Sequence, residues 1–395
     1  MNTPKIRFKG FEDDWEQRKF EDVGTVAMCK RIFKEQTSEE GEVPFYKIGT
    51  FGGIPDAYIT RELFEEYKKN YQYPNKGDIL ISASGSIGRT VEYTGKDEYY
   101  QDSNIVWLKH ENDLDNSFLK VLYGVIEWSC EGSTIKRLYN DNFLKTEFML
   151  PKIEEQIKIG EYFSKLDHLI TLHQRKCDET KQLKKFMLQK MFPKNGEKNP
   201  EIRFEGFTDA WEQRKVGDLL IERNQQAPMS DEYPLMAFIA NEGVAPKGER
   251  YDRSALVTDT VNKLYKKTEK GDFIYSSNNL ETGSIGLNKY GKACISPVYS
   301  IFEPTGIADS DFLGRRLVRK DFINAMVKWR QGVIYGQWRI HESDFLKIEI
   351  PVPSVEEQRK IGAYLDQLDN LITLHQRELE KLQNIKKSML EKMFV

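Results

Sequence analysis

The C-terminal forty residues carry an apolar stripe at helical spacing. Its positions recur at steps of three or four, as on the seam of a coiled coil: Leu368, Leu371, His375, Leu379, Leu382, Ile385, Met389 and Met393. A weaker stripe, interrupted by His173 and Thr180, comprises Leu166, Leu169, Leu183, Met187 and Met191. These patterns predict long helices over 154–191 and 356–393, each about 57 Å long. Because such a helix is marginal alone, each needs a partner, and the other copy is the nearest.

The two predicted helices open with nearly the same sequence. Residues 154–175 return as 356–377, an offset of 202 positions, and residues 7–19 return as 203–215, an offset of 196. The Lys-Gly-Asp segment 76–78 matches 270–272, and the Gly-x-x-Gly segment 85–88 matches 283–286. Solenoid repeats have periods of only about 20 to 50 residues, so these spacings predict duplication of a whole domain with its helix.

Between the repeated segments the two halves diverge. Residues 45–71 share little with 237–265, and residues 99–128 share little with 295–329. Strand candidates at 79–83 and 348–351 and helix candidates at 118–127 and 313–329 predict an α+β fold. We therefore expect two similar mixed α/β domains separated by a long antiparallel two-helix coiled coil, as a pseudo-two-fold internal repeat. The expected bounds are 1–150 and 201–350 for the domains, 151–192 and 351–395 for the helices, and 193–200 for a linker.

A histidine lies near the middle of each predicted helix. In an antiparallel pair, His173 and His375 should face each other. A polar seam position that fixes helix register is the main interpretation, and a histidine pair that holds a metal ion is the alternative. The complete expected seam is Leu166, Leu169, His173, Leu183, Met187, Leu368, Leu371, His375, Leu382 and Met389.

Composition restricts the class of protein. The chain has 395 residues, of which 39% are hydrophobic and 31% charged, with no apolar run long enough for a membrane helix. The first residues lack the apolar segment of a secretory signal, and the four cysteines are scattered, so the sequence predicts a cytoplasmic protein without structural zinc. The net charge of −3 means that any DNA-binding surface must be local.

Catalytic signatures are absent or incomplete. Residues 286–293 fit G-x-x-x-x-G-K, but Ala293 stands where a hydroxyl group should hold magnesium. Asp56 and Glu66 with Lys68 resemble a metal-dependent nuclease pattern that arises easily by chance in a charged chain. The chain contains no Pro-Pro, which the methyltransferase signature needs. We therefore predict no catalytic residue and no metal site in this chain.

Candidate DNA contacts come from the divergent interiors and the Gly-x-x-Gly turns. Arginine, lysine, asparagine and glutamine read base edges and hold phosphates, and turn amides can approach phosphate. An ordinary solvated polar surface is the alternative for each. The candidates are Ser84, Ser86, Lys136, Arg137, Asn140, Asn142, Ser284, Lys328, Arg330, Gln337 and Arg339.

The repeated segments resemble the DNA specificity subunit of type I restriction-modification systems. The resemblance rests on the Gly-Phe segments at 10–11 and 206–207, the Lys-Gly-Asp strands with Gly-x-x-Gly turns, and the Glu-Glu-Gln-x-Lys-Ile-Gly openings of both helices. It implies two target recognition domains that each read one half of a bipartite asymmetric site, and helices that set the spacer and dock the modification subunits.

The same resemblance implies partners. They are double-stranded DNA, two modification subunits that use S-adenosylmethionine to methylate adenine, and restriction subunits that use ATP and Mg²⁺; this chain would bind no cofactor. Two other classes remain open. An enzyme would cleave or methylate DNA as the purified chain, and a coiled-coil scaffold would show no sequence-selective DNA binding.

Overall fold

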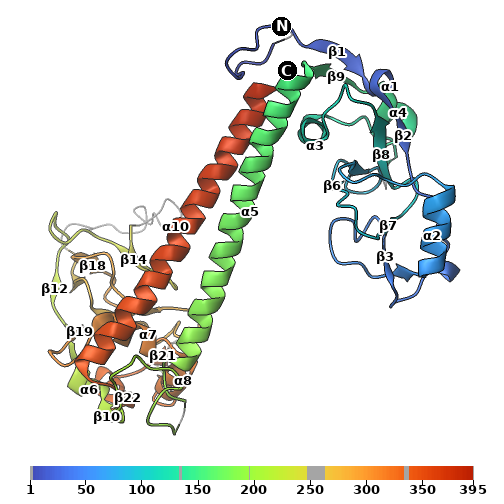
Figure 1. Ribbon diagram of the computed structural model, residues 1–395. Coiled ribbons are helices and arrows are strands. Elements are labelled where there is room, and N and C mark those ends of the chain that lie inside the picture. Colours follow the sequence, from blue (N-terminus) through green and yellow to red (C-terminus); the bar gives the residue numbers. More distant parts are fainter. Residues whose placement is uncertain (1–2, 133–135, 195, 247–262, 333–337, 395) are drawn as a thin grey trace. The chain divides into compact units, whose positions relative to one another are not determined.

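The computed structural model describes residues 3–132, 136–194, 196–246, 263–332 and 338–394. The chain forms two compact units, Met1–Arg175 with Gln376–Val395, and Lys176–His375. The long helices α5 (Ile153–Lys190) and α10 (Val355–Met393) each give one half to each unit, and within a unit the two halves lie side by side (Figure 1). The two helices predicted from the apolar stripes are therefore confirmed.

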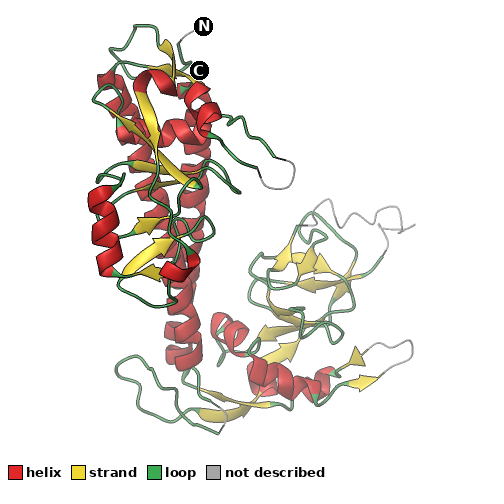
Figure 2. Cartoon of the chain, turned by 90° about the vertical axis from the view of Figure 1, so that its right-hand side faces the viewer, coloured by secondary structure: helices red, strands yellow, loops and turns green. Residues whose placement is uncertain are grey.

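The first unit is built on two small sheets rather than one large one (Figure 2). The larger, antiparallel sheet has the order β2 (Gly24–Ala27), β8 (Ile105–His110), β5 (Ile79–Ser82) and β6 (Thr90–Glu92), and the smaller has the order β4 (Tyr58–Ile59), β3 (Val43–Tyr46) and β7 (Tyr99–Tyr100). β1 (Glu16–Lys19) pairs with β9 (Glu147–Leu150). The helices are α1 (Phe20–Val23), α2 (Arg61–Asn70), α3 (Asn116–Val125) and α4 (Asn140–Lys145), with a 3₁₀ turn at Lys34–Gln36.

The second unit repeats this plan. Its four-stranded sheet has the order β11 (Leu220–Glu222), β19 (Ser300–Pro304), β16 (Phe273–Tyr275) and β17 (Ile285–Leu287), and a three-stranded sheet has the order β12 (Gln226–Ala227), β15 (Tyr265–Thr268) and β18 (Ala293–Ile295). The paired strands are β10 (Glu212–Lys215) with β22 (Glu349–Val352), β13 (Ala237–Ile239) with β14 (Gly243–Ala245), and β20 (Gln331–Gly332) with β21 (Trp338–Arg339). The helices are α6 (Val216–Leu219), α7 (Ser310–Arg316), α8 (Lys320–Val327) and α9 (Glu342–Phe345). The strands of the four-stranded sheets and of the β1–β9 and β10–β22 pairs take equivalent places, which confirms the α+β repeat. The three-stranded sheets differ, because β3 pairs with β7 in parallel whereas β15 pairs with β18 antiparallel.

Each unit contains the end of the long helix that begins in the other unit. Met393 lies in the core of the first unit, with Phe394 packed 6.0 Å from Trp15 between ring centroids. Met191 and Phe192 lie in the core of the second unit. The helix ends are therefore apolar because each completes a core that a distant part of the sequence begins.

Ion pairs show the antiparallel direction of the helix halves. In the first unit Lys386 on α10 binds Asp167 on α5, and in the second unit Lys184 on α5 binds Asp369 on α10. The two pairs are equivalent, since an offset of 202 relates both the aspartates and the lysines. Both units therefore hold their helix halves with the same pairing.

The single helix predicted for 313–329 is wrong. The segment forms α7 and α8, which are separated at residues 317–319. Leu317 is fully buried and Arg319 takes an extended backbone conformation (φ −72°, ψ 149°), while Arg316 pairs with Asp321 across the break. Burial of Leu317 and this ion pair override the helical spacing. Across the described ranges, no helix combines the length and the apolar character needed to cross a membrane.

Candidate nucleic-acid interface

The first turn of each long helix is tied to the repeated segment that opens its own half. In the first unit the buried Glu155 carboxylate accepts hydrogen bonds from Arg7 Nε (2.9 Å), Arg7 Nη2 (2.7 Å) and Trp15 Nε1 (3.1 Å). This carboxylate raises the pKa of Arg7 further above its ordinary value. In the second unit Glu357 accepts from Arg203 Nε (2.8 Å) and Nη2 (2.7 Å). Paired burial makes these carboxylates tolerable in the interior.

The residue after each of these glutamates is a buried glutamine, which binds the loop that leads into α3 in the first unit and into α7 in the second. Gln156 Oε1 accepts from the Asp115 N–H (2.9 Å), and its Nε2 donates to the carbonyls of Asp113 (3.0 Å) and Pro151 (2.9 Å). Gln358 does the same with Asp309 N–H (2.9 Å) and with the carbonyl oxygens of residues 307 (3.3 Å) and 353 (3.0 Å). We call Arg7, Trp15, Glu155 and Gln156, with their equivalents Arg203, Trp211, Glu357 and Gln358, the helix anchors.

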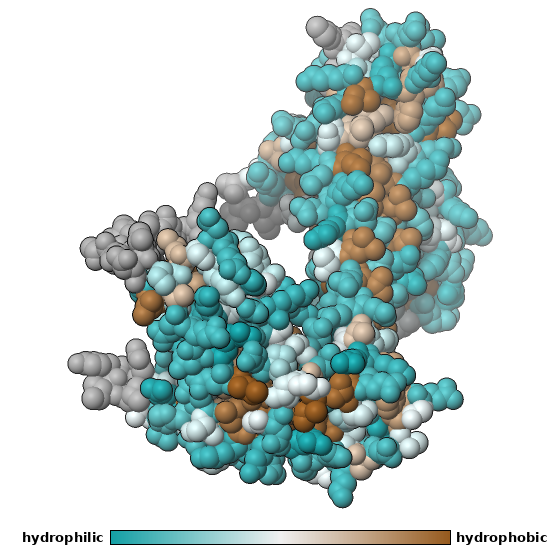
Figure 3. Space-filling view, turned by 90° about the vertical axis from the view of Figure 1, so that its left-hand side faces the viewer, coloured by the Kyte–Doolittle hydropathy of each residue, from teal (hydrophilic) through white to brown (hydrophobic). Residues whose placement is uncertain are grey.

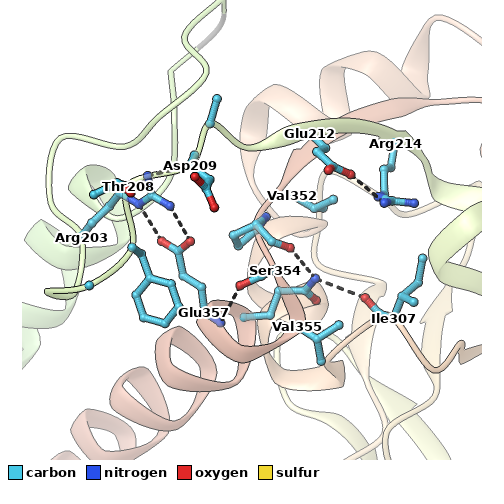
Figure 4. Close-up of a pocket in the computed structure, with 15 residues that line it drawn as sticks. Arg203, Thr208, Asp209, Glu212, Arg214, Ile307, Val352, Ser354, Val355 and Glu357 are labelled. Atoms are coloured by element: carbon cyan, nitrogen blue, oxygen red, sulfur yellow. Dashed lines mark hydrogen bonds and ion pairs between the residues drawn. The ribbon is translucent and has the colours of Figure 1, made fainter.

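The repeated glycine of the same motif allows close packing. A Cβ atom on Gly160 would lie 2.7 Å from the backbone N of Phe118, and one on Gly362 would lie 2.8 Å from Asp309 Oδ1. The Glu-Glu-Gln-x-Lys-Ile-Gly motif therefore fixes the start of each long helix against its globular fold. Figure 4 shows the second anchor beside a cavity of about 260 Å³ that Arg203, Asp209 and Ser354 help to line.

In the first unit, several candidate DNA-binding residues come together at the end of β5. Glu131 and Arg137 exchange two backbone hydrogen bonds (2.9 and 2.8 Å), and Ser84 forms a β-bridge with Arg137. The N–H of Gly85 donates to the Lys136 carbonyl (3.2 Å). Ser84 is buried, whereas Lys136, Arg137 and Ser86 are exposed. A turn after β5 and the segment 136–137, which are distant in the chain, thus form one surface.

The equivalent place in the second unit is formed by β20, β21 and the loop 276–284. The Trp338 N–H donates to Asn278 Oδ1 (2.7 Å), and Arg330 donates two hydrogen bonds of 2.8 Å to the Glu281 carboxylate. Hydrogen bonding to Arg330 lowers the pKa of Glu281. The Arg330 guanidinium lies over the Trp338 ring, 5.7 Å from its centroid.

The remaining candidates have varied surroundings. Asn142 donates to Glu131 Oε1 (2.9 Å) and is thus held within the fold, and Ser284 is buried. Asn140 and Lys328 are exposed at helix ends. Gln337 lies outside the described residues. Whether these residues contact DNA stays a prediction.

Three contributors were not among the candidates. Glu131 accepts a hydrogen bond from Asn142, Asn278 from Trp338 and Glu281 from Arg330, and all three lie outside the named helices and strands. The one sequence feature that could have pointed to Asn278 and Glu281 is their position just before the repeated Gly-x-x-Gly turn.

The predicted seam is only partly buried. Leu166 and Leu368 are buried in the two cores, and Met187, Leu382 and Met389 pack against them. Leu169, Leu183 and Leu371 stay 39%, 40% and 44% exposed. A pair of helices without a third layer covers only one stripe on each. His173 belongs to the first unit and His375 to the second, so their facing stays a prediction.

The incomplete catalytic motifs have structural surroundings. Residues 286–293 run from β17 through a turn into β18, and Lys292 there pairs with Glu232. Asp56 pairs with Lys47 (2.8 Å). The described part of the chain contains no group of three His, Cys, Asp or Glu residues that could hold a metal ion.

The face in Figure 3 is mostly hydrophilic, with apolar side chains in small separate patches.

Comparisons with known proteins agree with this repeat. A model of the type I restriction modification DNA specificity domain matches residues 12–182 and 208–384. A putative type I restriction enzyme specificity subunit of Haemophilus influenzae is 55% identical over 150 residues, which cover 38% of this chain and 39% of that relative. The putative MjaX specificity subunit of Methanocaldococcus jannaschii is 24% identical over 98% of this chain and 95% of that relative.

A solved structure shares the fold. The S subunit of a type I restriction-modification system from M. genitalium matches with a TM-score of 0.61 and 17% identity, covering 100% of this chain and 99% of that one. The family match covers both halves of the repeat and most of the chain. The chain therefore belongs to the family of type I restriction-modification DNA specificity proteins.

Proposed function

We propose that this specificity protein binds double-stranded DNA, that each unit reads one half of a bipartite asymmetric site, and that the paired helices set the spacer between the halves. The observation that carries the proposal is the contrast between the constant helix anchors and the different polar surfaces beside the Gly-x-x-Gly turns. Two domains that bind different base sequences can share the anchors that hold them to the helices, but they need different side chains at the DNA surface.

The proposed partners are two modification subunits, which would dock on the helices, and restriction subunits. S-adenosylmethionine, ATP and Mg²⁺ would belong to those partners, and this chain would supply recognition without chemistry. Because the proposed substrate is chromosomal and foreign DNA, the proposed place of action is the cytoplasm.

Domain exchange tests the proposal. Residues 16–150 are replaced by the corresponding segment of another family member, and the methylated sequence is read from the genome of cells that express the chain with its modification subunits. We expect one half-site to change while the other half-site is retained. An unchanged methylated sequence would refute the two-reader proposal.

Helix length gives a second test. Insertion of four residues, one helical turn, into α5 should lengthen the preferred spacer, because each added base pair separates the half-sites and also rotates one relative to the other. Retention of the original spacer would contradict the proposal that the helices set the spacer length.

A further inference from the structure

Two arginines occupy equivalent positions in the two units. Arg137 forms an isolated β-bridge with Glu131, Arg339 ends β21 and pairs with Gln331 on β20, and each arginine precedes a buried aliphatic residue, Leu138 or Ile340. The N–H of that aliphatic residue donates in both units to the segment after the central strand, to Ala83 O (2.9 Å) and to Ser277 Oγ (3.0 Å).

The following elements agree with this equivalence. A short helix comes next in both units, α4 or α9, and each contains a fully buried phenylalanine, Phe143 or Phe345. Each helix leads into a strand that pairs with the repeated opening strand, β9 with β1 and β22 with β10. The backbone therefore presents Arg137 and Arg339 in the same way to whatever each unit binds.

Both arginines are available to a ligand. Arg137 is exposed, and its side chain forms no ion pair within the described ranges. The Arg339 side chain is 56% exposed, and its ion-pair distance to Glu342 is 3.7 Å. A weakly held, exposed guanidinium can exchange its protein partner for a phosphate at little cost.

The residues directly before the two arginines differ. Lys136 is an exposed cation, whereas Trp338 is a 48% exposed indole whose ring is covered on one side by Arg330. Arg330 is itself fixed by its two hydrogen bonds to Glu281, so the indole is held in one orientation. A lysine donates to guanine O6 and N7, while an indole offers a large apolar surface to a base.

Every half-site has a phosphodiester backbone whatever its base sequence, so groups that are equivalent in the two units suit phosphate recognition, and groups that differ suit sequence preference. On the basis of the proposed DNA-reading function, we propose that Arg137 and Arg339 each hold a phosphate of one half-site, and that Lys136 and Trp338 determine base preference in the first and second half-sites.

The phosphate contacts are tested with the chain assembled with its modification subunits and DNA that contains the full site. Arg137→Ala or Arg339→Ala should weaken binding about tenfold for every sequence and reduce the salt slope by about one unit. Arg137→Lys should restore the slope. The controls are Arg18→Ala and Arg214→Ala in the repeated strands, whose side chains are 44% and 40% exposed and are paired with Glu16 and Glu212. An unchanged slope, or a loss confined to one base position, would overturn the phosphate role.

The base preferences are tested with a panel of single-base variants of both half-sites. Trp338→Ala should reduce discrimination between bases about tenfold at one position of the second half-site and leave the preference at the first half-site unchanged. Lys136→Ala should reduce discrimination at one position of the first half-site and leave the second unchanged. Tyr290→Ala is the matched control, because Tyr290 is 49% exposed and lies beyond the opposite end of the β16–β17 pair from the 276–284 loop. Trp338→Phe should retain much of the preference.

Undiminished preference in Trp338→Ala, or a change in the wrong half-site, would overturn this assignment. A wild-type complex with no preference for either half-site would instead refute the proposed function itself, so the two failures are distinguishable.

Discussion

The helix anchor of the first unit and that of the second unit use the same residue types, yet they are not equally strong. Glu155 accepts from both Arg7 and Trp15, whereas Glu357 accepts from Arg203, and the buried Trp211 indole N–H has no hydrogen-bond acceptor among the described residues. The glycine contact is also tighter in the first unit, where a Cβ would approach backbone.

The second unit has other groups at the helix–domain contact. Arg315 on α7 donates to Asp366 (2.5 Å) and Asp369 (3.0 Å) on α10, and Lys289 also reaches Asp366 (2.8 Å). Duplication has therefore preserved the position of the helix more strictly than the individual interactions that hold it. If so, equivalent substitutions should have unequal effects in the two units.

The largest losses of stability are expected at the anchor carboxylates. Glu155→Ala leaves the buried Trp15 N–H and the Arg7 guanidinium, whose side chain is 13% exposed, without their acceptor and should cost about 3 kcal/mol. Glu357→Ala should cost about 1 kcal/mol less, since one hydrogen bond fewer is lost. Calorimetric unfolding of the full chain, with a separate transition for each unit, measures both. Equal losses would show that the indole hydrogen bond adds nothing.

The helix glycines should differ next. Gly160→Ala gains helix propensity, but the new methyl group meets the backbone around Phe118, so we expect a net loss of about 2 kcal/mol. Gly362→Ala meets the Asp309 carboxylate, which caps α7 through the Phe312 N–H, but its nearest backbone atom is 3.3 Å away, so it should cost about 1 kcal/mol less. A stabilised Gly160→Ala protein in the same unfolding experiment would contradict the close approach.

The equivalent aspartates of the helix pair give a smaller contrast. Asp167→Asn removes the negative charge that pairs with Lys386 and should cost about 0.5 kcal/mol, as for a partly exposed pair. Asp369→Asn removes the charge that pairs with both Lys184 and the mostly buried Arg315 and should cost about 1 kcal/mol. Double-mutant cycles with Lys386→Met and Lys184→Met test whether the losses arise from these pairs.

The smallest effect concerns acid. Hydrogen bonds from Lys190 and Lys194 lower the pKa of Glu201 to about 2, and the equivalent residue of the first unit is Lys5. Because the folded pKa lies below the ordinary value of 4.5, this contribution is present above about pH 4.5 and is lost as the pH falls toward 2. Glu201→Gln should make the unfolding temperature of the second unit fall less steeply with pH below about 4.5 and leave that of the first unit unchanged. A parallel change in the first transition would argue against this local origin.

Much of the architecture could be predicted because the repeat and the apolar stripes are local in sequence. The predicted helix 154–191 corresponds to Ile153–Lys190, and the predicted helix 356–393 corresponds to Val355–Met393. Segments 76–78 and 270–272 directly precede equivalent central strands. In contrast, the helix predicted for 313–329 failed because burial of Leu317 outweighs local propensity.

The candidate DNA surface was predicted only as residue types. Lys136 and Arg137 were named from composition, but their pairing with the Ser84 turn depends on backbone bonds between distant segments. Glu281 and Asn278, which orient Arg330 and Trp338, have no pattern of their own in the sequence. Sequence pattern reports spacing along one element and not the partners that tertiary packing brings to it.

The sequence alone determined the duplication, the two long helices and their need for a partner, since a periodic apolar face must be covered and the second copy can cover it. Only the tertiary structure decided that Met191 with Phe192, and Met393 with Phe394, complete the core of the opposite unit. That result depends on contacts between separate segments, such as Trp15 with Phe394 in the first unit and Phe192 with Phe312 in the second. Their free energy arises from apolar surface that neither segment can bury by itself.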